Sequence, residues 1–408
     1  KMDFKFTPEQ EALRKEFDDF FEGIMKEAPA GWGGSLEDMY GSDEGWNFNR
    51  KVAQELAKKG WLVRAWPKEY GGQDAPIIEQ LIFSDCAGYH LAPGVDLFGI
   101  GMIGPTILAV GDEEQKKEHL IPISKGERFW CQLWSEPDAG CDLASLTTAA
   151  RREGDCYILN GQKTWTSGAH RADWGFGVFR TDPTKKRSGG ISFMLVDMKT
   201  KGVTVNPIYD MGGAHLFNEV FFDDVEVPVK NRVGEENEGW DVTRAAMNFE
   251  RSGVGMTSMV EKFLELLMEF CKNTEWNGKT LAKNPLIRDK LAQIAVEMEV
   301  GRALAYRIAW VQEKEGLLQA AALASASKVY GTETLQHASY TALEILGLPG
   351  LIKPGEMAPF NGLFETLYQF CPGINIAAGS SEVQRNIIAW MGLGLPRSWD
   401  EVFRRETE

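Results

Sequence analysis

Residues 132–143 read QLWSEPDAGCDL, and the pattern of residue types along the chain changes around this stretch. Helical patterning dominates up to about Ser124, whereas from Phe129 to about Val233 short runs rich in Val, Ile, Phe, Tyr and Trp alternate with glycine and charged turns. Such runs are strand signals, and their close, regular spacing favours an antiparallel sandwich or barrel over alternating β-α units. Taken alone, the stretch is equally typical of a turn between strands, because Pro137 and Gly140 are common turn residues.

Helical segments flank the β region on both sides. At the start of the chain, Thr7 is an N-cap candidate followed by a proline and, three residues after the cap, a glutamine, which together mark a helix start. Residues 49–59 have the pattern of one amphipathic helix. After Gly239, residues 286–314 and 317–346 form two long apolar-periodic stretches, which predict an antiparallel helical pair within a bundle.

We therefore predict a multidomain α+β protein. Its expected parts are an N-terminal helical domain over residues 1–128, a central antiparallel β-barrel or sandwich over 129–238, and a C-terminal four-helix bundle over 239–408. A G-x-G-x-x-G fingerprint is absent from the sequence, which argues against a Rossmann dinucleotide domain.

Composition narrows the classes of function. The chain has 408 residues, 43% of them hydrophobic and 25% charged, as in an ordinary globular protein. Its net charge of -15 argues against a general nucleic-acid binder, and no apolar run is long enough to predict a membrane span. The six cysteines and five histidines are dispersed, so we expect reduced thiols and no metal site. Acidic residues near the start do not resemble a signal or transit peptide, so a cytoplasmic location is expected.

A second segment, residues 161–169 (GQKTWTSGA), lies a short distance after the first. Trp165 by itself would be read as one of many core aromatics. Together, however, the two segments resemble the C-x-T-E-P-x-A-G-S-D and G-x-K-x-W-I-T-N-A motifs of acyl-CoA dehydrogenases. Small residues would let a flavin ring approach the backbone, and a tryptophan beside hydroxyl residues can cover one flavin face.

Two further segments extend the resemblance over essentially the whole chain. Residues 218–228 (NEVFFDDVEVP) are similar to the family's exit from the β domain, and we assign them a structural role only. Residues 377–386 (AAGSSEVQRN) resemble the family's Y-E-G-T-x-x-I-Q-R. The resemblance implies FAD as cofactor, with the following cofactor-binding residues: Gln132, Leu133, Trp134, Ser135, Trp165, Thr166, Ser167, Glu344, Gly347, Ser380 and Glu382.

The catalytic base departs from the commonest family pattern. Ala378 stands where a catalytic Glu is usual, and an alanine cannot remove a proton. Some family members place the base in an L-D-x-E-R segment after the β domain, and residues 247–251 (MNFER) resemble it, so Glu250 is the candidate base. The resemblance also implies the following substrate-binding residues: Cys141, Asn248, Arg251, Asp96, Ala378 and Gly379.

The implied reaction is α,β-dehydrogenation of an acyl-CoA thioester to the enoyl-CoA, with electrons passed to an electron-transfer flavoprotein and a homotetrameric assembly. One alternative is a ring-desaturating enzyme that uses Asp96 as base, although this residue could equally be a helix cap. Another is a redox-silent subunit of a hetero-oligomer, because residues 274–279 (TEWNGK) and 344–350 (EILGLPG) lack the R-x-x-F-G and Q-x-x-G-G-x-G patterns that normally reach a neighbour's FAD. The size and shape of the acyl group stay open.

Overall fold

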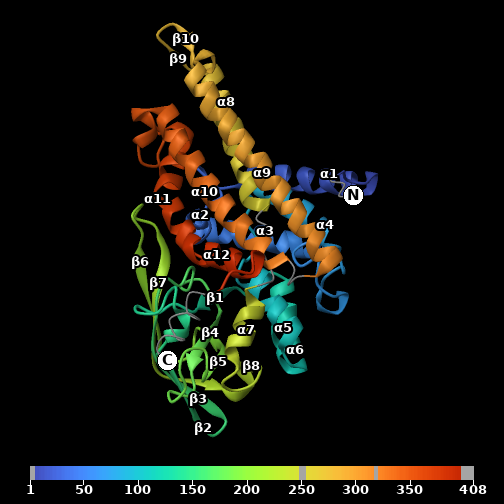
Figure 1. Ribbon diagram of the computed structural model, residues 1–408, viewed down its shortest axis with the longest axis vertical. Coiled ribbons are helices and arrows are strands. Elements are labelled where there is room, and N and C mark those ends of the chain that lie inside the picture. Colours follow the sequence, from blue (N-terminus) through green and yellow to red (C-terminus); the bar gives the residue numbers. More distant parts are fainter. Residues whose placement is uncertain (1–4, 248–253, 317–319, 397–408) are drawn as a thin grey trace. The chain divides into compact units, whose positions relative to one another are not determined.

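The computed structural model describes residues 5–247, 254–316 and 320–396 (Figure 1). The chain folds into two compact units, which we call the β unit and the bundle unit and describe separately. The β unit comprises Lys26–Pro76 and Ala92–Glu250, and the bundle unit comprises Lys1–Met25, Ile77–Leu91 and Arg251–Glu408.

The β unit contains eight strands and five α-helices among its described residues. The strands are β1 (Trp130–Leu133), β2 (Ala149–Glu153), β3 (Cys156–Lys163), β4 (Trp174–Arg180), β5 (Ile191–Asp197), β6 (Val203–Tyr209), β7 (His215–Pro228) and β8 (Arg232–Val233). The helices are α2 (Leu36–Tyr40), α3 (Asp43–Lys58), α5 (Gly104–Val110), α6 (Glu113–Ser124) and α7 (Gly239–Ala246).

The eight strands form one sheet in the order β6-β7-β3-β2-β4-β5-β8, with β1 joined to β4. Most pairs are antiparallel, as the sequence predicts, but β1 and β2 both run parallel to β4. In β7 the residues alternate between buried and more exposed positions over most of its length, which is typical of a strand with one face on a core. β5 is buried on both faces, so it lies inside the unit.

The helices α2, α3 and α6 of the β unit begin at ordinary side-chain caps. Ser42 caps α3 by accepting a hydrogen bond from the backbone N–H of Gly45 at 3.0 Å, so this helix starts at Asp43, six residues before the start that apolar periodicity predicted. The core of the unit is built from apolar side chains of the strands, among them Leu133, Tyr157, Met194 and Val220.

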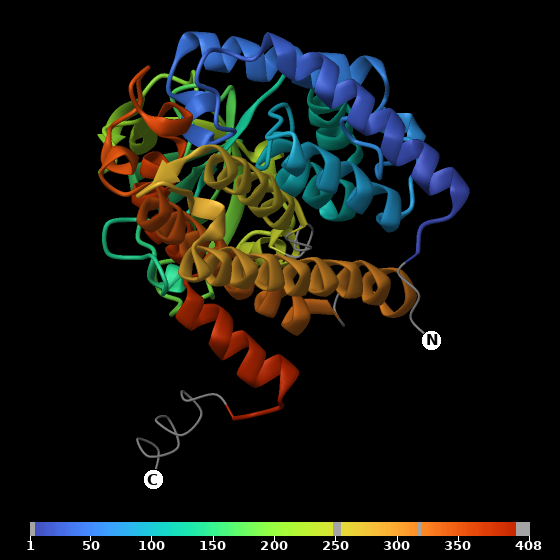
Figure 2. The same ribbon diagram turned by 90° about the horizontal axis from the view of Figure 1, so that it is seen from above.

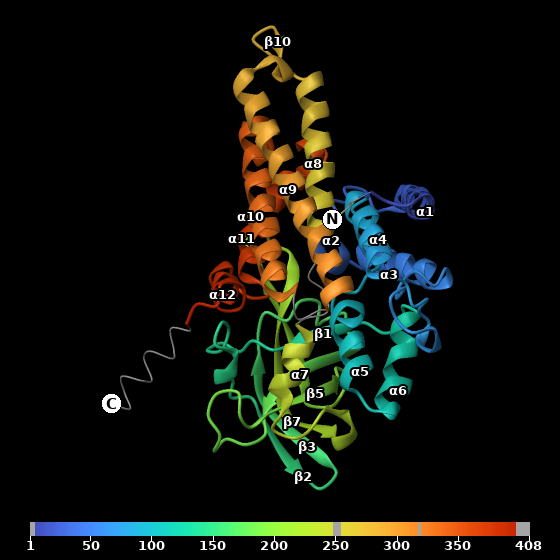
Figure 3. The same ribbon diagram turned by 45° about the vertical axis from the view of Figure 1, so that its right-hand side comes forward.

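The bundle unit combines helices that lie far apart in the sequence. Its α-helices are α1 (Pro8–Ile24), α4 (Ile77–Tyr89), α8 (Val254–Asn273), α9 (Pro285–Glu315), α10 (Ala321–Leu346), α11 (Leu363–Ile376) and α12 (Ser381–Ile387). A small hairpin of β9 (Glu275–Trp276) and β10 (Lys279–Thr280) lies at one end of α8 and α9 (Figure 3). α1, the darkest blue helix in Figure 2, packs against α4, and α4 packs against α8 and α9.

α10 is the central helix of the bundle. It contacts α8, α9, α11 and α12, and its buried positions are mostly Ala, Ser and Thr, which let neighbouring helices approach closely. Phe263, Leu267, Ile294, Leu335 and Phe364 belong to the apolar core that these helices share. Burial of such side chains stabilises each by about 1.5–3 kcal/mol relative to exposure.

Two sequence expectations can be compared directly with the helices. Thr7 caps α1 with the full capping box, in which Gln10 bonds back to the backbone N–H of Thr7 at 2.9 Å. The long stretches predicted over 286–314 and 317–346 correspond to α9 and α10. Within the described ranges, no helix is both long enough and apolar enough to cross a membrane. The exact domain boundaries at 128 and 238 stay predictions.

Candidate functional site

The first sequence segment begins on β1 and continues beyond its end. Gln132 and Leu133 are on the strand; Leu133 is fully buried, whereas Gln132 is half-buried. Trp134 and Ser135, which follow the strand, are also half-buried. The indole of Trp134 packs edge-on against Phe176, with ring centroids 6.2 Å apart. The segment therefore presents polar groups and an aromatic ring at the surface of the β unit.

The second segment continues from the end of β3. Trp165 has φ +58°, a left-handed conformation that non-glycine residues rarely adopt, and its side chain is 60% exposed. Thr166 is buried and Ser167 is half-buried. Backbone strain of this kind costs of order 1–3 kcal/mol and persists only when the surroundings impose it. The neighbouring residues do so here, because the N–H of Thr164 donates to the carbonyl of Ser135 at 2.8 Å.

The two segments are also joined by a buried ion pair. Lys163 has no exposed surface, and its Nζ lies 2.9 Å from Oε1 of Glu136. The same ammonium donates to the carbonyl oxygens of Trp134 at 3.2 Å and Val178 at 2.8 Å. Three acceptors match the three N–H donors of a lysine. Lys163 therefore fixes the backbone of the first segment from within the β unit.

The carboxylate of Glu136 also accepts several hydrogen bonds. Its Oε2 accepts from the N–H of Thr147 at 2.7 Å and from the hydroxyl of that residue at 3.0 Å, and its Oε1 accepts from the N–H of Thr148 at 2.9 Å. Burial opposes ionisation of this carboxyl, but Lys163 and these donors outweigh it and hold the pKa of Glu136 below its ordinary value. Burial lowers the pKa of Lys163, and the charge of Glu136 opposes this only in part.

Asp96 is buried in the β unit, where its carboxyl accepts hydrogen bonds from backbone N–H groups. Its side chain is 5% exposed, and its oxygens accept from the backbone N–H of Phe98 and of Trp130, both at 3.1 Å, and from that of Gly99. Burial raises the pKa of Asp96 to about 7, although these three hydrogen bonds lower it. The carboxylate thus ties the segment before α5 to the first residue of β1.

The fourth sequence segment forms the turn between α11 and α12 in the bundle unit. Ala378 has φ +53° and is exposed, and Gly379 follows it at φ +83°. A Cβ on Gly379 would lie 2.6 Å from Nε2 of Gln384, which donates to the carbonyl of Ala378 at 2.8 Å. Ser380 caps α12 by accepting from the N–H of Val383 at 3.4 Å. The amide of Gln384 thus holds this turn in its unusual backbone conformation.

Glu382 and Glu344 are the two acidic residues expected near FAD from the bundle unit. Glu382 is exposed in the first turn of α12, where a backbone N–H and the hydroxyl of Ser380 lower its pKa. Glu344 is exposed near the end of α10 and forms an ion pair with Lys290 of α9. Gly347 ends α10 at φ +65°, and its N–H donates to the carbonyl of Leu343.

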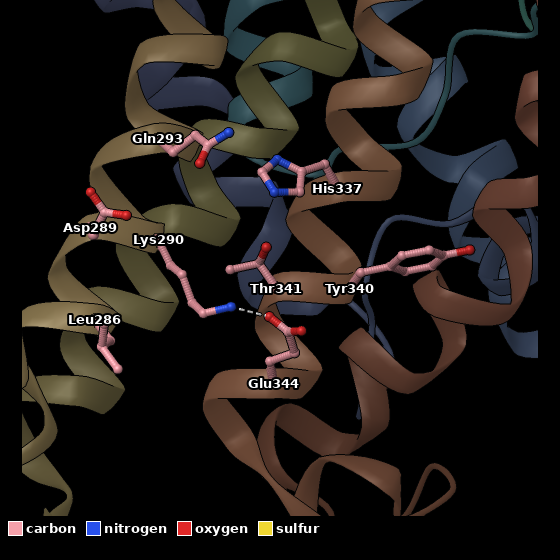
Figure 4. A pocket seen from close by; sticks show the side chains of 8 residues that line it. All are labelled: Leu286, Asp289, Lys290, Gln293, His337, Tyr340, Thr341 and Glu344. Carbon is pink, nitrogen blue, oxygen red and sulfur yellow. Dashed lines mark hydrogen bonds and ion pairs between the residues drawn. The ribbon is translucent and has the colours of Figure 1, made fainter.

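A hollow of about 520 Å³ lies between α9 and α10 beside Glu344 (Figure 4). Figure 4 shows the ion pair of Lys290 with Glu344, whereas the ring of Tyr340 points away from Lys290. The residues that line the hollow come equally from the two helices: Leu286, Asp289, Lys290 and Gln293 from α9, and His337, Tyr340, Thr341 and Glu344 from α10. Its lining is mixed in charge, so it does not select an anionic ligand.

The remaining predicted site residues divide into two groups. Cys141 is exposed, in a turn near the end of the first segment. Asn248, Glu250 and Arg251, which include the candidate base, lie outside the described residues. The geometry thus brings the first two segments together within the β unit, and it places the fourth segment and Glu344 separately in the bundle unit.

Comparison with known proteins identifies the family. Residues 7–127 match the acyl-CoA dehydrogenase N-terminal domain, residues 131–225 the middle domain, and residues 237–392 the C-terminal domain. The chain belongs to the acyl-CoA dehydrogenase family. It is accordingly an FAD-dependent oxidoreductase that acts on CH–CH bonds.

Several relatives of this acyl-CoA dehydrogenase are similar over nearly the whole chain. Acyl-CoA dehydrogenase FadE26 of Mycobacterium tuberculosis is 35% identical, over 97% of this chain and 100% of the relative. Among solved structures, the Tcur3481-Tcur3483 steroid ACAD has a TM-score of 0.86 and 33% identity, covering 97% of this chain and 100% of that one. The ChsE4-ChsE5 complex from Mycobacterium tuberculosis gives a TM-score of 0.86 and 35% identity with the same coverage.

The chemistry of the first two segments suits a flavin. The exposed indole of Trp165 offers a flat apolar surface, and Ser135 and Ser167 offer partly exposed hydroxyls. The indole N–H of Trp134 and the hydroxyl of Thr166 are buried without a hydrogen-bond partner among the described residues. Buried polar groups are usually hydrogen-bonded. Among the described residues of this acyl-CoA dehydrogenase, these two groups are therefore available to bond a ligand such as the flavin.

Sequence reasoning missed three residues that shape the β-unit part of the site. Glu136 and Lys163 lie inside the two quoted motifs but were not assigned a role, and Asn218 was assigned to structure only. The spacing of a glutamate and a lysine in adjacent conspicuous motifs was the available signal for the first two. Nothing in the local sequence indicates the contacts of Asn218, because they depend on how β7 lies beside the loop after β3.

Proposed function

We propose that this acyl-CoA dehydrogenase oxidises a CoA thioester between its α- and β-carbons, with Glu250 as the base that removes the α-proton. The observation that carries the proposal is the joining of the two flavin-type segments by Lys163, Glu136 and the Thr164–Ser135 hydrogen bond. Residues that resemble separate family motifs are thereby held together within the β unit. The assignment of Glu250 itself rests on the resemblance of residues 247–251.

The chemistry divides between the chain and its cofactor. The α-proton of a thioester is weakly acidic, so a carboxylate must stand near it and the carbonyl must be polarised by fixed donors. Ala378 keeps a backbone N–H for that purpose while its methyl group carries no charge, and the turn around it is held by Gln384. FAD, when bound, supplies the acceptor for the hydride from the β-carbon. Desolvation of the base, for which we propose Glu250, would raise the pKa of its carboxyl toward neutrality.

The surroundings of Asp96 favour Glu250 over Asp96 as the base. Three backbone N–H groups already occupy the Asp96 carboxylate, and it is almost fully buried. A base in that position would have to give up hydrogen bonds that tie β1 to the preceding segment. A structural role therefore accounts for all the described contacts of Asp96.

For the substrate, we propose a bulky ring-bearing acyl-CoA. The support comes from the similarity to the Tcur3481-Tcur3483 steroid ACAD over the full length of that chain. We further propose that electrons leave the reduced flavin for an electron-transfer flavoprotein, as is usual for the family. The matched test substrates are a steroid-side-chain acyl-CoA and a straight-chain acyl-CoA of similar hydrophobicity.

For the assembly, we propose a tetramer in which the bundle unit provides the contacts between subunits. Val296 and Val300 lie exposed in an apolar groove on α9, and Leu286, Leu348 and Leu351 are also largely exposed on this unit. Exposed apolar patches of this kind mark interaction surfaces. We expect a second copy of this chain as the neighbour. The similarity to the ChsE4-ChsE5 complex supports the alternative, an assembly with a second, different chain.

The test is anaerobic titration of the purified holoenzyme with each acyl-CoA while the flavin absorption band is followed. Bleaching by the steroid-type thioester, together with formation of an enoyl-CoA detected by mass, supports the proposed reaction. A bound flavin that no acyl-CoA reduces contradicts it. Equal bleaching by the straight-chain thioester contradicts the proposed substrate preference alone.

A further inference from the structure

Asn218 on β7 holds both backbone polar groups of Thr166. Its backbone carbonyl accepts from the N–H of Thr166 at 3.0 Å, and its side-chain Nδ2 donates to the carbonyl of Thr166 at 2.9 Å. The side chain of Asn218 is fully buried. Together with the Thr164–Ser135 hydrogen bond, these contacts fix the backbone on both sides of Trp165, whose φ is strained.

The environment determines the orientation of the Asn218 amide. Its Nδ2 faces two backbone carbonyls, those of Thr166 and, at 3.3 Å, Leu216, and carbonyls can only accept. Its Oδ1 must then accept from Nε2 of His215, which lies 2.8 Å away. The amide can satisfy Thr166 only if His215 carries its proton on Nε2.

The same amide also faces a second histidine. Nδ2 of Asn218 lies 3.2 Å from Nδ1 of His170, which can accept only when it is unprotonated. Nε2 of His170 lies 3.0 Å from the carbonyl of Tyr40 and therefore donates to it. A proton on Nδ1 would place two donors face to face and remove the contact between His170 and Asn218.

The two imidazole rings are stacked, with centroids 3.9 Å apart and an interplanar angle of 23°. Two protonated rings at this distance would repel each other. The other groups that face the pair are the guanidinium of Arg171, which donates to the carbonyl of Tyr40, and the ring of Tyr209. Burial lowers the pKa of His170, and the neighbouring His215 and Arg171 act in the same direction.

We propose that Asn218 is a positioning residue for the cofactor segment Trp165 to Ser167, and that His170, stacked on His215, makes this positioning dependent on pH. The inference rests on the proposed contact of this segment with FAD. A proton on Nε2 of His215 and an unprotonated Nδ1 on His170 keep the amide of Asn218 directed at Thr166. Protonation of His170 withdraws one of its partners, so FAD binding weakens on the acid side.

The experiment measures FAD release from the holoenzyme by flavin fluorescence between about pH 8 and about pH 5.5, where histidines titrate. The variants are Asn218→Ala, which removes the amide, and His170→Asn, whose carbonyl can accept from Asn218 but cannot be protonated. Asn206→Ala on the neighbouring strand β6, where the side chain is exposed, is the matched control. Trp165→Ala reports separately on whether the segment contacts FAD at all. Circular dichroism identifies any variant that has not folded.

The wild-type protein and the control are expected to bind FAD progressively more weakly below the pKa of His170, by up to about tenfold in all, which is the loss expected when the amide itself is removed. His170→Asn is expected to lose this pH dependence while keeping tight binding, and Asn218→Ala to bind about tenfold more weakly at pH 8. If Asn218→Ala does not fold, the flat pH profile of His170→Asn carries the test. A wild-type profile that is flat, or one that His170→Asn leaves unchanged, overturns the inference. Unchanged binding in Trp165→Ala overturns both the inference and the proposed cofactor contact.

Discussion

Nζ of Lys163 lies 2.9 Å from Oε1 of Glu136, and this buried pair joins the two segments that the sequence assigns to the cofactor. Neither side chain is exposed enough to reach a ligand freely, since Lys163 is 0% and Glu136 6% exposed. Their role is therefore to fix backbone: Lys163 bonds to the carbonyl of Trp134, while Glu136 bonds to the N–H groups of Thr147 and Thr148. A cofactor surface built from two loops needs such an internal link.

Replacing Lys163 by Met tests this link. The substitution leaves the Glu136 carboxylate buried without its counter-ion, and removing one partner of a buried pair costs about 3–5 kcal/mol. We expect a thermal unfolding midpoint well below that of the wild type and loss of FAD on purification. The double variant Lys163→Met with Glu136→Leu should recover part of the stability but not the FAD, because the carbonyl of Trp134 stays without its donor.

Lys199→Met is the matched control, because Lys199 forms an ion pair with Asp173 while 77% of its side chain is exposed. Exposed pairs contribute about 0–1 kcal/mol, so this variant should melt close to the wild type and keep its FAD. A Lys163→Met protein as stable as the control would contradict the structural role of the buried pair.

Gly168 is expected to be intolerant of a side chain because of Tyr40. Its φ is +67°, and a Cβ would lie 2.7 Å from Cε1 of the Tyr40 ring. Gly213 has a comparable φ of +89° but no atom within 4 Å of an added Cβ, so Gly213→Ala isolates the backbone cost, about 1–2 kcal/mol. Gly168→Ala should lose clearly more stability, measured by urea unfolding, and should also release FAD more readily. Equal losses of stability in the two variants would show that the contact with Tyr40 adds nothing to the backbone cost at Gly168.

Because the pKa of Asp96 is raised in the folded protein, we expect the stability of the fold to depend on pH. The pKa of Asp96 is raised by burial to about 7, above the ordinary 3.8, so the folded protein holds a proton that the unfolded chain has lost. Stability from this group is therefore present at low pH and declines as pH rises toward the folded pKa. Between about pH 5.5 and about pH 7.5, the melting temperature of the wild type should fall relative to that of Asp96→Asn. Parallel curves for the two proteins would mean that Asp96 is ionised throughout this range.

The sequence predicted those features that depend on local pattern. The capping box at Thr7 and the long apolar periodicities of α9 and α10 are set by neighbouring residues, and the structure has both. Residues 132–143 and 161–169 were expected to form one site, and they lie together in the β unit. Family motifs identified these two segments because they combine small residues, an aromatic and hydroxyls in a fixed order.

Features that depend on distant segments could not be predicted in this way. α4 packs with α1 and the C-terminal helices although the sequence places it in the middle of the N-terminal region. The parallel pairing of β1 with β4 joins residues more than forty positions apart, such as Trp130 and Trp174. Asn218 acquires its role only because β7 brings it to the backbone of Thr166, 52 residues away in sequence. The local pattern of side chains along the sequence does not indicate which distant residues will be neighbours in the fold.

The central claim is that this acyl-CoA dehydrogenase uses Glu250 as its base, and rapid-mixing reduction of the bound flavin tests it most directly. The substrate is the acyl-CoA that reduces the wild type fastest, and the variants are Glu250→Gln and Asp96→Asn. We predict that Glu250→Gln keeps its FAD but reduces it at least about 10³-fold more slowly, in the range that loss of a general base produces, whereas Asp96→Asn reduces it at a rate close to that of the wild type. Unimpaired reduction in Glu250→Gln, with loss of reduction in Asp96→Asn, would contradict the claim and make Asp96 the base.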